Sequence, residues 1–163
     1  MLKKNYFTFL FLLTSFLVNS QVVINEYSAS NFDSHLDNYG EYEDWVELYN
    51  TTNSDIDLNG WSLTDKPSNL SKWSFPGSFI VSANSVAIVY CSGLNELVGG
   101  VAHTNFKITQ TKAGEVFVLS DAGGNIIDSA RAVPAQKSHS RGRGVNGGTT
   151  WSVFTSATPN TNN

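Results

Sequence analysis

From residue 21 onward the sequence consists of short β-prone runs and shows almost no helical periodicity. The runs are rich in Val, Ile, Phe, Tyr, Trp and Thr, which suit a pleated, half-buried backbone. Asn, Asp, Gly and Ser separate them, and these residues favour chain reversal. The predicted strands are residues 22–28, 44–50, 60–64, 71–75, 79–82, 85–91, 115–120, 125–131 and 150–154. Nine short strands predict an all-β sandwich or barrel built from antiparallel hairpins.

One predicted strand is unusual because both of its faces carry large side chains. In residues 44–50, Val46 and Leu48 alternate with Trp45, Glu47 and Tyr49, so we expect both faces to be covered. A carboxylate between two aromatic residues needs hydrogen-bond donors. We therefore expect Glu47 to accept backbone or side-chain hydrogen bonds.

Residues 1–20 have the layout of a secretory signal peptide. Lys3 and Lys4 precede an apolar run over residues 7–18, and Asn19-Ser20 offers a cleavage point. The run of twelve residues is too short for a spanning helix, which needs roughly 20. We predict cleavage before Gln21, no membrane span in the mature chain, and a secreted or cell-surface location.

The charge of the mature chain argues against nucleic-acid binding. Fourteen Asp and Glu against eight Lys and Arg give a net charge of −6, and residues 21–65 hold ten of the acids and no Lys or Arg. A nucleic-acid site needs a broad basic face. The basic cluster of Arg131, Lys137, Arg141 and Arg143 fits a solvated face or partners for the acidic half. Cys91 is the single cysteine, so a core, and not an intramolecular disulfide, must hold the domain.

An ordered series of motifs resembles the lamin tail domain in a bacterial, secreted form. It runs from Ile24-Asn25-Glu26 through residues 44–50 (DWVELYN), 57–65 (DLNGWSLTD) and 73–76 (WSFP) to Trp151. The resemblance covers about residues 22–158 and implies an immunoglobulin-like, antiparallel β-sandwich. The predicted structural core is Trp45, Val46, Leu48, Trp61, Trp73, Phe75 and Trp151.

Four further segments resemble the N-terminal module of one subgroup of this family. Its members are large secreted bacterial proteins whose next domain is similar to CotH-like kinases. The four segments are residues 25–31, 37–45, 103–107 and 139–143. The resemblance implies an accessory module beside a second domain, but no kinase chemistry, because the chain has no Gly-rich phosphate loop. We therefore predict a sandwich over residues 21–158, with residues 159–163 as a linker stub or C-terminal tail.

No catalytic signature is present, and we predict that the chain is not an enzyme and needs no cofactor. His35, His103 and His139 are scattered and suggest loop or strand-edge positions. A single oxygen-rich loop is a calcium candidate, although acidic loops are also commonly just solvated. Its members are Asp33, Asp37, Asn38, Glu41, Glu43 and Asp44.

The sequence favours a non-catalytic extracellular interaction or scaffold module. Its expected partner is an unidentified protein or glycan at the cell surface, together with further domains of a parent chain. One alternative is a carbohydrate-binding module assisted by calcium, which requires an exposed aromatic strip. The other is the leading accessory domain of a truncated CotH-like kinase or another enzyme.

Overall fold

The computed structural model describes residues 21–109 and 114–163, so the predicted signal peptide lies outside the described residues. Within these ranges the chain forms thirteen strands and no helix, hence no helix that could cross a membrane. The strands are β1 (Val22–Ser28), β2 (Trp45–Asn50), β3 (Ile56–Asp57), β4 (Ser62–Thr64), β5 (Trp73–Ser74), β6 (Ile80–Val81), β7 (Val86–Tyr90), β8 (Glu96–Val98), β9 (Val101–His103), β10 (Val116–Ser120), β11 (Ile126–Arg131), β12 (Ser140–Arg143) and β13 (Trp151–Phe154).

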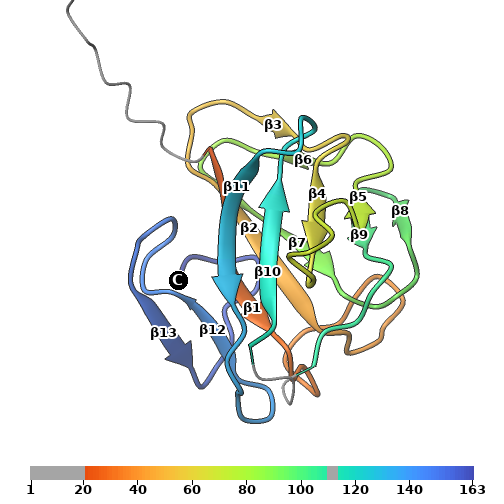
Figure 1. Cartoon of the computed structure of the whole chain (residues 1–163). Coiled ribbons are helices and arrows are strands. Elements are labelled where there is room, and N and C mark those ends of the chain that lie inside the picture. The colour runs from red at the N-terminus through yellow and green to blue at the C-terminus, as the bar shows by residue number, and fades with distance from the viewer. Residues whose placement is uncertain (1–20, 110–113) are drawn as a thin grey trace, which may run out of the picture.

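The strands form two facing layers, visible in Figure 1 as β11, β10, β4 and β5 in front of β1, β2 and β7. The larger sheet has the order β13-β12-β1-β2-β7-β9-β8, and the smaller has the order β11-β10-β4-β5. β3 and β6 form a separate two-stranded ribbon. This architecture is an immunoglobulin-like β-sandwich, so the predicted fold class is confirmed.

The pairing is antiparallel with one exception. β7 and β9 run parallel, because the chain turns back through β8 before it joins the sheet edge. This parallel pair is a local departure from the antiparallel arrangement that the sequence predicted. Gly99 and Gly100, with φ of 61° and 82°, form the tight β8–β9 turn that places β9 in this direction.

Nine strands were predicted, and each is present within about two residues of its expected bounds. Four further strands were missed: β3, β8, β9 and β12. β3, β8 and β9 have only two or three residues, which is too short for a clear alternation pattern. β12 (Ser-Arg-Gly-Arg) has no apolar residue, so its sequence lacks the usual strand signal.

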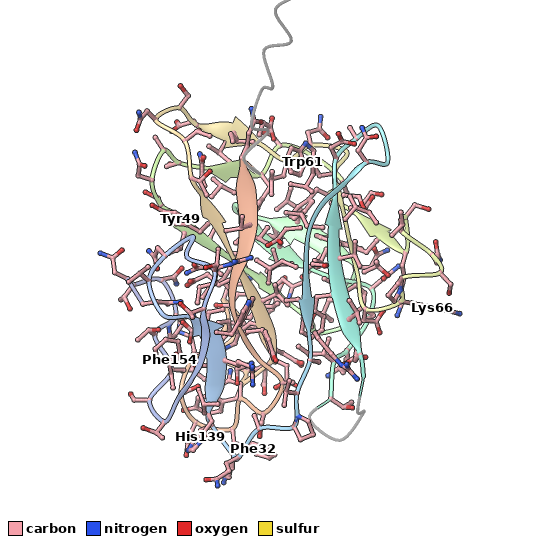
Figure 2. The ribbon with its side chains drawn as sticks, turned by 60° about the vertical axis from the view of Figure 1, so that its left-hand side comes forward. Phe32, Tyr49, Trp61, Lys66, His139 and Phe154 are labelled. Atoms are coloured by element: carbon pink, nitrogen blue, oxygen red, sulfur yellow. The ribbon has the colours of Figure 1, made fainter. Side chains whose placement is uncertain are left out.

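The core fills the space between the two layers, as the side chains between β1 and β10–β11 in Figure 2 show. The rings of Tyr27 and Phe117 meet across it with centroids 5.0 Å apart. Trp45, Val46, Leu48, Trp73 and Phe75 are buried, whereas Trp61 and Trp151 are half-buried against the core. Trp45 belongs to a small second cluster with Ile88 and Tyr90. Cys91 is a buried free thiol of the main core.

A β-bulge in β1 alters which side chains face outward. The register with β2 shifts between Ile24, opposite Leu48, and Glu26, opposite Glu47. A bulge inserts one residue and breaks the strict two-residue alternation. Ile24 and Tyr27 consequently both reach the core, while Asn25 and Glu26 lie beside Glu47 on the other face.

Candidate functional site

The loop between β1 and β2 is held together by the buried side chain of Asn31. Its Nδ2 donates to the carbonyl oxygens of His35 and Glu43 at 2.6 and 2.8 Å. Its Oδ1 accepts from Ser34 Oγ at 2.7 Å and from the His35 amide at 3.2 Å. Its backbone amide donates to Asp44 Oδ1 at 2.8 Å. One asparagine therefore closes residues 31–44 into a defined loop.

The six predicted calcium ligands lie on this loop, but their side chains are engaged separately. Asp37 Oδ1 accepts from the amides of Tyr39 and Glu41 at 2.8 and 2.9 Å, which is an internal turn. Asn38 Oδ1 lies 2.7 Å from His103 Nε2, and Asp33 accepts a hydrogen bond from Ser138 Oγ.

The remaining calcium candidates also face different neighbours. Lys107 Nζ lies 3.1 Å from both carboxylate oxygens of Glu43, and the Glu41 side chain is exposed. Across residues 21–109 and 114–163, no group of three or more His, Cys, Asp or Glu side chains is placed to hold a metal ion. The structure therefore does not bring the six predicted ligands together.

Two of the three histidines, His35 and His103, both stack on the ring of Tyr90, and the expectation for His103 was wrong. His103 ends β9 in the interior of the larger sheet and is fully buried. Its Nδ1 lies 3.0 Å from Ser92 Oγ, and its Nε2 faces Asn38 Oδ1. With that oxygen as acceptor, Nε2 carries the proton and the Ser92 hydroxyl donates to Nδ1. His103 thus ties the loop to the sheet.

His35 and His139 lie outside the strands, as expected. The His35 ring stacks on Tyr90 with centroids 6.0 Å apart, and its Nε2 lies 3.0 Å from the Tyr90 hydroxyl. Burial lowers the pKa of His35. The His139 carbonyl oxygen accepts from Ser28 Oγ at 3.0 Å.

Two buried carboxylates lie side by side at the bulge. Glu26 and Glu47 are cross-strand partners, and neither is exposed to solvent. Glu47 Oε1 accepts from Asn25 Nδ2 at 3.1 Å, and its Oε2 accepts from the Asn160 amide at 2.8 Å. The expectation that Glu47 accepts hydrogen bonds is confirmed. Burial, with a smaller contribution from nearby Glu26, raises the pKa of Glu47 to about 7.

The C-terminal residues cover these two carboxylates. Thr158 donates from its amide to Glu26 Oε1 at 3.0 Å and from its hydroxyl to Glu26 Oε2. Asn163 Nδ2 donates to the Arg143 carbonyl oxygen at 2.8 Å. Residues 159–163, expected to be a linker stub or tail, are therefore hydrogen-bonded against the sandwich. Their Thr, Pro and Asn composition gave no sign of this, because half of these hydrogen bonds come from backbone amides and all of the acceptors lie far away in the sequence.

Several large apolar side chains of the same loop are exposed at one end of the molecule. Phe32, Leu36, Tyr39 and Tyr42 are exposed, and Leu94, just before β8, joins them. We call these five residues the loop surface. In Figure 2 Phe32 marks this end, opposite the end where Trp61 lies. Exposed aromatic side chains at a loop are typical of contact surfaces.

Fold and geometry together define an immunoglobulin-like sandwich module whose aromatic loop lies at one end. The lamin tail domain model matches residues 18–133, more than half of the chain, so the chain belongs to the lamin tail domain family. This is a family of non-catalytic, immunoglobulin-like domains. A search of the curated proteins finds no match. β12, β13 and the C-terminal residues lie beyond the matched range.

Proposed function

We propose that this chain is a non-catalytic interaction or scaffold module of a secreted or cell-surface bacterial protein. The observation that carries the proposal is the loop surface: Phe32 and Tyr42 line one hollow, Tyr39 and Leu94 line an adjoining one, and the aromatic residues of the family motifs are buried or half-buried. Clustered exposed aromatics are costly in water and are retained where a partner covers them. The signal-peptide pattern of residues 1–20 supports export.

Export of the protein from the cell is tested by determining the N-terminal residue of the native protein. Mass spectrometry of the culture medium and the washed cell surface should find a chain that begins at Gln21. A native protein retained inside the cell with an intact Met1 would contradict the extracellular part of the proposal.

The interaction role is tested by site-specific photo-crosslinking on intact cells. A photoreactive residue in place of Tyr39, on the loop surface, should form adducts with cell-surface material. The matched control replaces Asn53, an exposed residue of the turn between β2 and β3, and this turn lies at the other end of the sandwich in Figure 1. Equal crosslinking yields at Tyr39 and Asn53 would contradict the proposal that the loop surface is the contact region.

A carbohydrate-binding module is the second candidate, and Tyr39 and Tyr42 favour it. Both rings are about half exposed on the loop surface and offer the apolar faces that sugars stack on. None of the four tryptophans is exposed, so a tryptophan platform does not contribute. Calorimetric titration with soluble cell-wall glycans discriminates the two candidates.

A further inference from the structure

A cavity opens beside the loop surface, where β1 leaves the larger sheet. Its volume is about 440 Å³, within the range of about 300–1,000 Å³ that ligand pockets have. Phe32 and Tyr42 are the aromatic residues of its wall, and Asp44 and Ser30 are among its polar residues. Lys107 and Glu43 complete its charged rim.

The one cation that lines the cavity, Lys107, is paired with Glu43, whereas Asp44 and Ser30 retain unused hydrogen-bonding capacity. Asp44 is half-buried, receives only the Asn31 amide at 2.8 Å on its carboxylate, and forms no ion pair within the described part of the chain. Ser30 is 2% exposed, and its hydroxyl has no hydrogen-bond partner among the residues that the structure describes. A buried polar group left unpaired is costly. The ionised Asp44 carboxylate only accepts hydrogen bonds and the Ser30 hydroxyl can accept or donate, so a ligand that donates hydrogen bonds suits both groups.

Burial raises the pKa of Asp44 to about 6, and the neighbouring charge of Glu43 adds to this effect. The amide of Asn31 and the charge of Lys107 oppose the shift without cancelling it. A positive group inside the cavity would stabilise the ionised carboxylate, because opposite charges attract strongly where water is partly excluded.

Two lysines of this chain already contact residues that line the cavity, one through a carboxylate and one through an aromatic ring. Lys107 Nζ is held by both carboxylate oxygens of Glu43 at 3.1 Å. Lys137 Nζ lies 4.9 Å from the centroid of the Phe32 ring, which is a cation–π contact. Tyr42, on the same wall, offers a second exposed ring. The surroundings of the cavity are thus suited to ammonium or guanidinium groups.

An adjoining hollow of about 380 Å³ extends the negative charge beyond the cavity. The two spaces share Glu43. The hollow is lined by Asp37, Tyr39, Glu41, Glu43, Leu94 and Glu96. No Lys or Arg occurs in residues 21–65, so the loop supplies acids without compensating bases. An elongated partner with spaced positive charges would complement both spaces.

We propose that the cavity binds a lysine or arginine side chain presented by an extended basic segment of a protein partner. Asp44 and the Ser30 hydroxyl accept its hydrogen bonds, and Phe32 and Tyr42 cover its methylene stem and charge. The neighbouring hollow takes the next basic side chain of the segment. This inference rests on the proposed function and specifies the partner's chemistry.

The test uses the mature protein and a fluorescein-labelled peptide of alternating Gly and Lys, with binding followed by fluorescence anisotropy. Asp44→Asn keeps an oxygen for the Asn31 amide but removes the charge, and should weaken binding about tenfold, the equivalent of one lost ionic contact. Asp55→Asn is the matched control, because it removes one charge from an exposed residue directly before β3, a strand at the other end of the sandwich in Figure 1. It should change the affinity less than about twofold, since screening limits distant charges.

Equal weakening by both substitutions would overturn the proposal, because it would mean general attraction to an acidic protein. Tight binding of neutral mono- or disaccharides that Asp44→Asn abolishes would also overturn it, in favour of a sugar site. If the peptide fails to bind while Tyr39 still crosslinks on cells, the cavity assignment fails and the interaction role stands. If both fail, the proposed function itself is wrong.

Discussion

Glu26 and Glu47 face each other across β1 and β2, and both carboxylates are shielded from solvent by the C-terminal residues. The bulge at Asn25 creates this pairing, because it brings two consecutive residues of β1 to one face. Two adjacent buried acids repel each other unless one is protonated or both are well supplied with donors. Stability should therefore depend on pH and on the C-terminal contacts.

The free energy of unfolding should fall as pH rises through the range set by Glu47. The folded pKa is about 7 and the ordinary value is 4.5, so between these values the folded state holds a proton that the unfolded state releases. The stabilising contribution of Glu47 is then largest below about pH 4.5 and is lost up to about pH 7, by about 3 kcal/mol at roughly 1.4 kcal/mol per pKa unit. Urea denaturation of Glu47→Gln across this range should give a flatter profile.

Glu41→Gln is the control for this profile, because Glu41 is exposed. Asp44, whose pKa is about 6, adds a slope of the same sign and should remain visible in the Glu47→Gln protein. An unchanged slope in Glu47→Gln would show that its carboxyl group does not titrate abnormally.

Thr158→Ala should destabilise the protein by about 1–3 kcal/mol, the cost of leaving a buried acceptor oxygen without its donor. The Thr158 hydroxyl donates to Glu26 Oε2, and the substitution removes this bond while the backbone bond remains. Thr155→Ala is the matched control, since Thr155 is exposed, and it should stay within about 0.5 kcal/mol. Equal midpoints in urea for the two variants would mean that the C-terminal residues do not support Glu26.

The strands with β-branched and aromatic residues could be predicted from sequence because their side chains alone favour the pleated backbone. β12 could not be predicted, because Ser140 to Arg143 form a strand only through pairing with β1 and β13. The same limit applies to His103, whose burial depends on the three-residue strand β9 and on a partner 65 positions away, Asn38. Such long-range pairings leave no local pattern.

The candidate site was predicted in part. The acidic loop was recognised from composition, but its carboxylates do not converge, because Asn31 and Asp37 fold it through internal hydrogen bonds. The need of Glu47 for donors was predictable from its aromatic neighbours. It was not predictable that the Asn160 amide would be one of these donors, because a backbone group has no sequence signature.

Gly142→Ala should destabilise the protein by about 1–3 kcal/mol through overpacking. A Cβ at this position would lie 2.8 Å from Phe154 Cε2 and from Asn163 Nδ2, and 3.0 Å from Glu26 Cγ. The new methyl group therefore pushes on β13 and the C-terminal residues together. Thermal unfolding followed by circular dichroism measures the effect.

Gly144→Ala provides the control from the same segment, because its Cβ would meet Ser152 Oγ and Thr150 O at 3.7 and 3.8 Å, which is ordinary contact. A smaller loss at Gly142 than at Gly144 would contradict the close packing of the C-terminal residues.

Arg143 and Asp128 join the two sheets where β12 separates from β1. Asp128 Oδ2, on β11, accepts from the Ile24 amide and from Arg143 Nη2, both at 2.8 Å. Arg143 Nε donates to the Ile24 carbonyl oxygen at 2.8 Å, so the pair replaces the ladder bonds that β12 no longer supplies at Ile24. The guanidinium group also lies 5.2 Å from the centroid of the Trp151 ring.

Arg143→Lys should cost about 2–4 kcal/mol, because an ammonium group cannot reproduce the fork that reaches the backbone and the carboxylate together. Arg131→Lys, on an exposed residue, is the control and should be nearly neutral. A double-mutant cycle with Asp128→Asn in urea denaturation should give a coupling energy above about 0.5 kcal/mol, as expected for directly bonded groups. Strict additivity of the two substitutions would mean that the Arg143–Asp128 pair does not link the sheets.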